Sequence, residues 1–302
     1  MFESLESRRY LNASLDENGL LTVFGTPGND VVHMCEDGKL TQVIVNGQVT
    51  TFRTADIKAI MVDVGKGDDE VILGRRNAPA VLLGGAGDDT LSGGNGNDQI
   101  YGGPGNDYMF GRDGDDIMVG GPGSDQFIGG NGRDTADYSS RTEDLRIRVG
   151  WKWDDGALDE GDNVMDDIEV VLGGSGNDEI LTCVDRPIEI WGGAGNDTLI
   201  GGPGNDTLYG NEGDDSLVGG RGNDYLADAP PGSNRHGGND TLRGQGGDDT
   251  LVAISGSNTL MAGWGFDTIR ARNGTIDTID LGVGTYDLDA DVHDVILPAK
   301  AA

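Results

Sequence analysis

The sequence predicts an all-β protein of short repeats, held together by bound metal rather than by a large apolar core. Three observations lead to this prediction: a nine-residue period, one apolar residue in each unit, and an aspartate that recurs at one position. The stretch from Gly93 to Phe110, GGNGNDQIYGGPGNDYMF, contains all three, because it is the pattern Gly-Gly-x-Gly-x-Asp-x-apolar-x written twice.

The nine-residue period runs in blocks through the 302-residue chain. The first block begins at Gly84, a single unit begins at Gly173, a second block begins at Gly192, and a less regular third block begins at Arg235. The sixth position of the units holds Asp30, Asp69, Asp89, Asp98, Asp107, Asp116, Asp125, Asp134, Asp178, Asp197, Asp206, Asp215, Asp224, Asp240, Asp249 and Asp267. In the third block Asn258 replaces the aspartate of one unit, and the unit near Gly274 is expected to have slipped out of phase.

Each unit has too little apolar surface to fold on its own. Its eighth position supplies one apolar side chain, such as Leu91 or Ile100, and burying it contributes about 1.5–3 kcal/mol. Ordering each of the nine backbone residues costs about 1–2 kcal/mol, and more at glycine. Another interaction must therefore hold the turns. Aspartate carboxylates and the carbonyls of glycine-rich turns are hard oxygen donors, of which Ca²⁺ takes six to eight.

These units resemble the hemolysin-type calcium-binding repeats of the RTX family, and the resemblance covers about half of the chain. It implies a right-handed parallel β-roll (a β-solenoid) in which two units form one coil. Each of several Ca²⁺ ions would lie between a turn and the turn two units later. The resemblance thus implies metal ligands at the sixth-position aspartates from Asp69 to Asp267. It pairs Asp89 with Asp107, Asp98 with Asp116, Asp107 with Asp125, Asp116 with Asp134, Asp197 with Asp215, and Asp206 with Asp224.

Composition divides the chain into six segments. These are an N-terminal tail with an export-related motif (1–19), an N-terminal β cap with partial repeats (20–73), the first β-roll block (74–137), a connector (138–172), the second block (173–227), and a degenerate third block with the C-terminal tail (228–302). In the cap, Asp37-Gly38 and Asn46-Gly47 predict hairpins. The half-coils LGRRNAPAVLL (73–83) and TCVDRPIEIW (182–191) lack a glycine-rich turn. They are expected to continue the roll on an edge without metal, which would leave Asp178 near Asp197.

The connector has its own pattern. In LRIRVGWKW (145–153), apolar residues including Trp151 and Trp153 alternate with basic ones, which predicts a strand with one apolar face. Aromatic residues beside a basic face could bind nucleic acid or sugar, but the net charge favours an amphipathic strand next to the acidic loop 154–167. For that loop two interpretations stay open: a solvated charge run, or a further calcium ion held through Asp159, Glu160 or Asp162.

Charge and composition exclude several function classes. Acidic residues outnumber basic ones by 53 to 21, and the formal charge of −32 disfavours nucleic acid and anionic membranes but favours cations. No apolar run reaches transmembrane length, and the start of the chain lacks the apolar core of a cleavable signal peptide. Cys35 and Cys183 give no disulfide framework, and free thiols or one bridge are both open. The histidines are isolated and no nucleophile motif occurs, so the protein is not expected to be an enzyme.

The sequence therefore predicts a secreted or cell-surface calcium-binding protein with a surface, matrix or adhesion role. Its expected partners are calcium ions, a polysaccharide or protein of the cell surface or matrix, and, by the resemblance, a type I exporter. Two alternatives are a non-catalytic secretion or folding module related to RTX proteases, lipases or epimerases, and an RTX cytolysin. The repeats are expected to fold only when calcium is bound.

Overall fold

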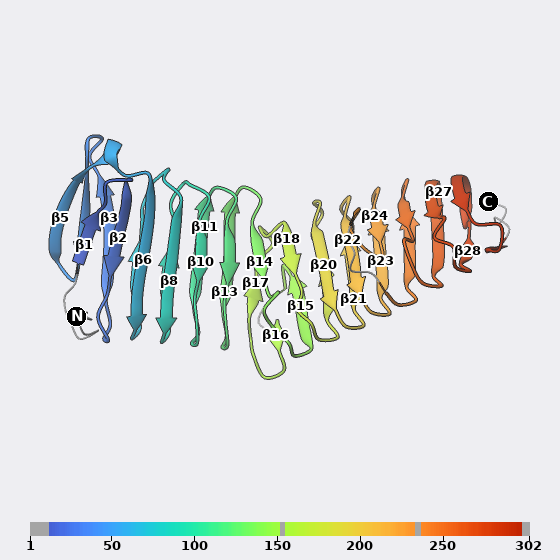
Figure 1. Ribbon diagram of the computed structural model, residues 1–302, viewed down its shortest axis with the longest axis horizontal. Helices are drawn as coiled ribbons and strands as arrows, with labels where there is room; N and C mark the ends of the chain where they lie inside the picture. The colour runs from blue at the N-terminus through green and yellow to red at the C-terminus, as the bar shows by residue number, and fades with distance from the viewer. Residues whose placement is uncertain (1–11, 152–154, 233–236, 298–302) are drawn as a thin grey trace, which may run out of the picture. The chain divides into compact units, whose positions relative to one another are not determined.

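The computed structural model describes residues 12–151, 155–232 and 237–297 (Figure 1). The chain forms two compact units: unit 1 is Met1–Asp137 with Glu160–Ile168, and unit 2 is Tyr138–Asp159 with Glu169–Ala302. The described residues contain strands, one short 3-10 helix η2 (Thr54–Asp56), and no α-helix, which confirms the all-β prediction. The expected export motif at residues 5–11, and Trp153, lie outside the described residues.

Unit 1 consists of two sheets, and successive strands of the repeats alternate between them. One sheet has the order β1 (Asn12–Leu15), β2 (Leu20–Phe24), β6 (Ala59–Lys66), β8 (Ala80–Ala86), β10 (Gln99–Tyr101), β12 (Ile117–Val119) and β14 (Thr135–Asp137). The other has the order β5 (Gln48–Arg53), β4 (Leu40–Val45), β3 (Val31–Glu36), β7 (Glu70–Ile72), β9 (Thr90–Ser92), β11 (Tyr108–Asp113), β13 (Gln126–Asn131) and β17 (Asn163–Val164). Within the repeats the pairing is parallel, and Figure 1 shows strands such as β6, β8 and β10 lying side by side.

The register of these sheets follows from the repeat. Ile100 pairs with Met118, and Met109 with Phe127, so strands two units apart are neighbours. Eighth-position side chains such as these four are all 0% exposed and form the interior. Two nine-residue units therefore make one coil, and the parallel β-roll that the sequence predicted is confirmed.

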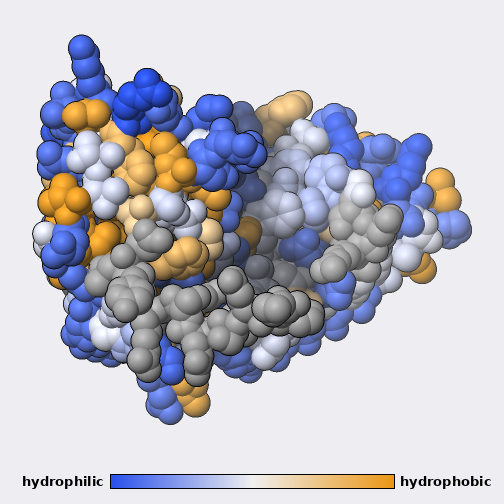
Figure 2. All heavy atoms as spheres, turned by 60° about the vertical axis from the view of Figure 1, so that its left-hand side comes forward, coloured by the Kyte–Doolittle hydropathy of each residue, from blue (hydrophilic) through white to orange (hydrophobic). Residues whose placement is uncertain are grey.

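The N-terminal part of unit 1 is antiparallel. Strands β3, β4 and β5 form the two hairpins expected at Asp37-Gly38 and Asn46-Gly47. Asn46 (φ 47°) and Gly47 (φ 79°) are both left-handed, as a two-residue type I′ turn requires. This end of the unit faces forward in Figure 2, which shows apolar side chains among hydrophilic ones. Exposed apolar residues on these strands include Val31, Leu40 and Val49.

Unit 2 repeats the same plan. One run of paired strands is β16 (Gly156–Ala157), β15 (Leu145–Val149), β19 (Glu179–Thr182), β21 (Thr198–Gly202), β23 (Ser216–Arg221), β25 (Thr241–Gly246), β27 (Thr259–Ala271), β28 (Thr278–Asp280) and β30 (Val295–Leu297). The other is β18 (Val170–Leu172), β20 (Glu189–Ala194), β22 (Thr207–Glu212), β24 (Tyr225–Ala227), β26 (Thr250–Val252), the second half of β27, and β29 (Val283–Ala290). All pairs are parallel except β15 with β16.

The strand predicted for residues 145–153 is shorter than expected. Strand β15 ends at Val149 and buries Leu145, Ile147 and Val149, but Trp151 is 49% exposed. The prediction that Trp151 continues the apolar face is wrong. Gly150 adopts a left-handed φ of 82°, and the Trp151 N–H donates to the Arg148 carbonyl, so a turn replaces the strand.

Candidate metal centre

The sixth-position aspartates form columns along the turns of each unit. The backbone N–H of Asp89 donates to Oδ1 of Asp107 (2.8 Å), and the N–H of Asp107 donates to Oδ1 of Asp125 (2.9 Å). The pairs Asp98–Asp116, Asp116–Asp134, Asp197–Asp215 and Asp206–Asp224 have the same bond at 2.7–2.9 Å. The structure therefore brings together the aspartates that the resemblance paired.

Every sixth-position aspartate proposed as a ligand belongs to one of four columns. Unit 1 has one column with Asp30, Asp69, Asp89, Asp107 and Asp125, and another with Asp98, Asp116 and Asp134. Unit 2 has one column with Asp178, Asp197, Asp215 and Asp240, and another with Asp206, Asp224, Asp249 and Asp267. The Asp178 N–H donates to Asp197, 19 residues later, so the expected proximity of these two residues is confirmed.

The second carboxylate oxygen of these residues has a different environment. Oδ2 is buried and has no hydrogen-bond partner in Asp69, Asp89, Asp107, Asp116, Asp125, Asp197, Asp206, Asp215, Asp224 and Asp249. A buried charged oxygen without a compensating partner is strongly unfavourable. Three of the four columns therefore present two or more oxygens without a partner from the chain itself. The column of Asp98 presents such an oxygen at Asp116, whereas the Gly94 N–H donates to Oδ2 of Asp98.

The glycines leave space beside these oxygens. A Cβ on Gly84 would overlap Oδ2 of Asp89 and lie 2.7 Å from the carbonyl oxygen of Gly102, one coil later. At Gly93 the same position would overlap Oδ2 of Asp98 and lie 2.8 Å from the Gly111 carbonyl oxygen. A carboxylate and a carbonyl from consecutive coils thus converge at the first glycine of the unit. This all-oxygen donor set fits Ca²⁺.

The second glycine of the unit is required for another reason. Gly103 has a left-handed φ of 110°, and a Cβ there would overlap the carbonyl oxygen of Gly85 in the preceding coil. Any side chain would separate the two turns, because their backbones touch. The second glycine of the unit therefore allows consecutive turns to approach closely.

Burial and mutual repulsion act on the columns together. Burial is the main cause that raises the pKa of Asp89 and Asp116 to about 7 and that of Asp125 to about 8, and neighbouring carboxylates raise these pKa values further. The pKa values of Asp197 and Asp240 are likewise raised to about 8, first by burial. Without a cation, ionisation of these carboxyls therefore opposes the folded state.

Side chains alone do not complete a metal site. Among residues 12–151, 155–232 and 237–297, no three His, Cys, Asp or Glu side chains converge as metal ligands. The columns contain neither histidine nor cysteine, so soft or imidazole-preferring metals are disfavoured. Backbone carbonyls must supply the remaining ligands, as calcium sites commonly allow.

The column of Asp240 continues through an asparagine. Asn258 Oδ1 accepts the Asp240 N–H (2.7 Å), and the Asn258 N–H donates to Oδ1 of Asp277 (2.6 Å). Asp277 lies 19 residues after Asn258 and not 18, which is the slip expected near Gly274, and it still takes the next place in the column. The amide of Asn273 donates to Oδ2 of Asp277 and to the Gly256 carbonyl, so a neutral donor group occupies these oxygens.

The column aspartates Asp277 and Asp294 were not among the predicted ligands, and Asp162 was expected only as one alternative for the acidic loop. Asp162 accepts the Asp125 N–H, and Asp294 accepts the Asp277 N–H. Their turns lack the Gly-Gly-x-Gly signature. The remaining signal is an aspartate followed two residues later by an apolar residue, as in Asp162 and Val164.

Three turns have an apolar residue in place of the aspartate, and each begins a column. The N–H groups of Ala80, Leu145 and Ile188 donate to Oδ1 of Asp98, Asp178 and Asp206, respectively, at 2.7–3.0 Å. The roll thus continues through the two half-coils that lack a glycine-rich turn, as expected.

An arginine is present in each of these turns. Arg76, only 2% exposed, contacts Glu36 and the Thr41 hydroxyl. Arg141 pairs with Glu143 (2.5 Å), and Arg186 pairs with Glu169. At the turns where the carboxylate is missing, the chain therefore supplies a positive charge of its own.

Replacing Arg76 with glutamine is expected to destabilise unit 1 in saturating calcium. Loss of one partner from a buried pair costs about 3–5 kcal/mol, and we expect the lower part of this range because the Glu36 side chain is 32% exposed. Thermal unfolding followed by circular dichroism measures the effect. Arg53→Gln is the control, since the exposed Arg53–Asp56 pair contributes less than about 1 kcal/mol; equal losses in the two variants would contradict the prediction.

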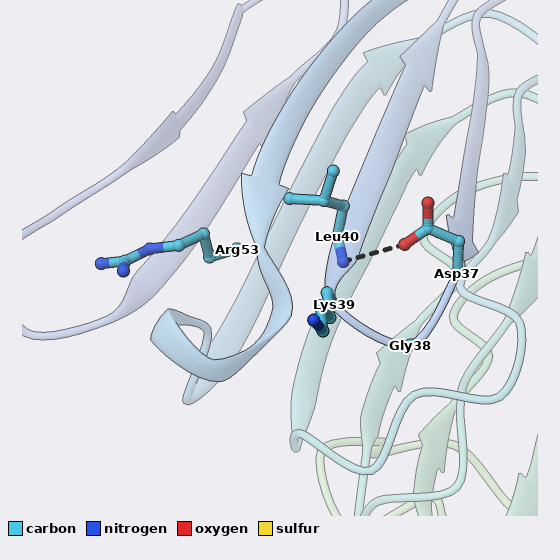
Figure 3. Close-up of a pocket in the computed structure, with 5 residues that line it drawn as sticks. All are labelled: Asp37, Gly38, Lys39, Leu40 and Arg53. Atoms are coloured by element: carbon cyan, nitrogen blue, oxygen red, sulfur yellow. Dashed lines mark hydrogen bonds between the residues drawn. The ribbon is translucent and has the colours of Figure 1, made fainter.

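Other candidate sites carry no recognisable chemistry. The pocket in Figure 3 is lined by Asp37, Gly38, Lys39, Leu40 and Arg53 and lies at a hairpin turn, where the Leu40 N–H donates to Asp37 Oδ1 (3.0 Å). Cys35 and Cys183 are exposed and free. Within the described part of the chain, no helix is long and apolar enough to cross a membrane.

Comparison with protein families agrees with this geometry. The model of the RTX calcium-binding nonapeptide repeat matches four copies, at residues 81–109, 101–136, 191–226 and 236–275. A comparison with curated proteins finds no match. These parts of the chain are therefore similar to RTX calcium-binding nonapeptide repeats, as the sequence predicted.

Proposed function

We propose that the protein is a calcium-dependent β-roll that folds and acts outside the cell, as a non-catalytic surface, matrix or adhesion element. The observation that carries the proposal is the set of buried aspartate Oδ2 atoms without a partner, which occur in all four columns. Polar atoms in such positions cost free energy unless a ligand satisfies them. Repetition along whole columns favours a structural role over a single reactive site.

The chain's own groups prepare each site. Oδ1 of one aspartate accepts a backbone N–H from the preceding turn of its column, which leaves Oδ2 directed at the first glycine of its own turn. Bound calcium supplies the positive charge that offsets this buried carboxylate. Because both turns contribute oxygens, binding free energy becomes folding free energy for the pair of coils.

The proposed location outside the cell rests on calcium supply. Sites of this ligand type in extracellular modules bind with dissociation constants on the order of 10⁻⁴–10⁻³ M, well above what the cytosol provides. RTX repeat proteins are typically extracellular, and a type I exporter is the proposed route. The proposed partner is a polysaccharide or protein of the cell surface or matrix. Mass spectrometry of culture supernatant and cell fractions tests the location, and a protein found only in the cytosol would refute it.

Asp107→Asn is expected to raise the calcium concentration at the folding midpoint several-fold. Asp107 lies between Asp89 and Asp125 in its column, so two sites lose a charge, while asparagine can still accept the Asp89 N–H. Circular dichroism during calcium titration gives the midpoint. Lower protein stability at saturating calcium, with an unchanged midpoint, would contradict a ligand role.

Asp30→Asn is the matched control. The Asp30 carboxylate is also buried, but it accepts hydrogen bonds from the Thr26 N–H, the Thr26 hydroxyl and the Asn46 amide. Its oxygens are thus satisfied by the chain. We expect its calcium midpoint to change less than that of Asp107→Asn.

A further inference from the structure

Part of the acidic connector rejoins unit 1 as an additional turn of the roll. Asp162 is 0% exposed, and its Oδ1 accepts the Asp125 N–H at 2.8 Å. The Asn163 N–H donates to the Asp125 carbonyl (2.7 Å), and Val164 pairs in parallel with Phe127. Asp162 and the buried Val164 therefore occupy the sixth and eighth positions of a repeat unit.

This turn differs from the regular repeats in its charge. The regular turn before it has Gly123 at its fourth position, whereas the corresponding residue, 37 positions later, is Glu160. The Gly123 N–H lies 3.4 Å from Glu160 Oε1, so this carboxylate is held against the turn. The added turn thus brings Glu160 as well as Asp162 to the end of the column.

The added turn faces Asp125, whose carboxylate has an oxygen without a hydrogen-bond partner. Asp125 is 0% exposed, and its Oδ2 has no hydrogen-bond partner. A Cβ on Gly120 would overlap this oxygen, so the glycine keeps the space beside it open. Burial is the main cause that raises the pKa of Asp125 to about 8, and the charges of Asp162, Asp107 and Glu160 raise the pKa further.

We propose that Asp125 and Asp162 hold a further calcium ion at this junction, with Glu160 adding negative charge beside it. The site rests on the proposed calcium-dependent roll, and its added turn, with Glu160 and Asp162, lies outside the residues matched by the repeat family, which end at 136 before resuming at 191. Three carboxylates do not converge on one point here, so backbone carbonyls complete the site. Its occupation anchors the returning connector to unit 1.

The competing explanation is that Asp162 only accepts the hydrogen bond that keeps the turns in register. The molecule itself shows how to separate the two roles, because Asn258 accepts the equivalent bond from Asp240 at 2.7 Å. Asp162→Asn therefore retains the acceptor and removes the charge. Glu160→Gln removes only the neighbouring charge.

Native mass spectrometry of the full chain in calcium resolves the number of bound ions. We expect Asp162→Asn to carry one calcium ion fewer than the wild-type protein at saturation, with an unchanged β-type circular dichroism spectrum. Glu160→Gln should bind the same number of calcium ions at saturation but should need a higher calcium concentration to reach saturation. Asp113→Asn is the control, since Asp113 lies outside the columns and pairs with the Asn131 amide.

Amide hydrogen exchange at Asn163 and Val164 gives a second readout. We expect faster exchange at these amides in Asp162→Asn, and no change in Asp113→Asn. Equal ion counts in wild type and Asp162→Asn would overturn the junction site. A wild-type protein that binds no calcium would instead overturn the proposed function, so the two failures are distinguishable.

Discussion

Removal of calcium at neutral pH is expected to abolish most of the β-type circular dichroism signal of the protein, and returning calcium is expected to restore it. The buried, unpaired Oδ2 atoms of the columns repel one another once ionised. At 100 times the dissociation constant, one site contributes about 2.7 kcal/mol to the folded state. Several sites therefore supply free energy comparable to the whole stability of a typical domain, about 5–15 kcal/mol.

The measurement is a far-UV spectrum in excess chelator, followed by titration with calcium. The transition should be cooperative, because each repeat contacts its neighbours. Magnesium is the matched control, and it should restore the signal poorly, since it demands a tighter octahedral geometry. A full β spectrum in chelator, or equal recovery with magnesium, would refute calcium-dependent folding.

Acid is expected to stabilise the calcium-free fold, which is the second large effect. In the folded state, burial raises the pKa of Asp98 to about 6, of Asp89 to about 7 and of Asp125 to about 8, from an ordinary 3.8. Between about pH 4 and pH 8 the folded chain thus binds more protons than the unfolded chain. The free energy of unfolding then falls as pH rises through this window.

The size of the effect depends on how many carboxyl groups have a raised pKa in the folded state. Each pKa unit corresponds to about 1.4 kcal/mol per group, so the calcium-free protein should be several kcal/mol more stable at pH 5 than at pH 8. The β-type circular dichroism signal of calcium-stripped protein, followed as the pH is lowered from 8 to 5, tests this difference. Added salt screens exposed charges far more than buried ones, so the trend should survive 0.5 M NaCl.

Calcium reverses the direction of the pH dependence. Ligand carboxylates must lose their protons to bind metal, so binding releases protons and the calcium midpoint should fall as pH rises. A calcium-free stability that is flat or increases with pH would show that the column carboxyls do not oppose folding.

The regular part of this fold could be predicted from sequence because one rule is repeated. Each unit places an apolar residue two positions after its aspartate, and the structure buries the former and aligns the latter, as at Leu91 and Asp89. Glycine marks the turns, since consecutive backbones touch there. The nine-residue period, the buried interior and the aspartate columns therefore all follow from the same nine-residue unit.

The irregular parts could not be predicted because their turns do not follow the repeat pattern of the sequence. Asp162 joins its column 37 residues after Asp125, and nothing near it resembles a glycine-rich turn. Trp151 continues the alternation of its strand in sequence, but the left-handed Gly150 turns the chain away. At Asp162 the contact with a distant turn decides the structure, whereas at Trp151 a local turn does.

The spacing of the columns has a further consequence for how such a chain can change. Neighbouring aspartates in a column are separated by 18 residues at Asp89 and Asp107, by 25 at Asp215 and Asp240, and by 37 at Asp125 and Asp162. The same bond from N–H to Oδ1 forms in each case. The register of the coils therefore depends on the order of the turns and not on the number of residues between them. A coil can acquire an added loop while the coils on either side keep their register. The repeats therefore allow a new segment to be inserted into one coil while the structure of the other coils stays the same.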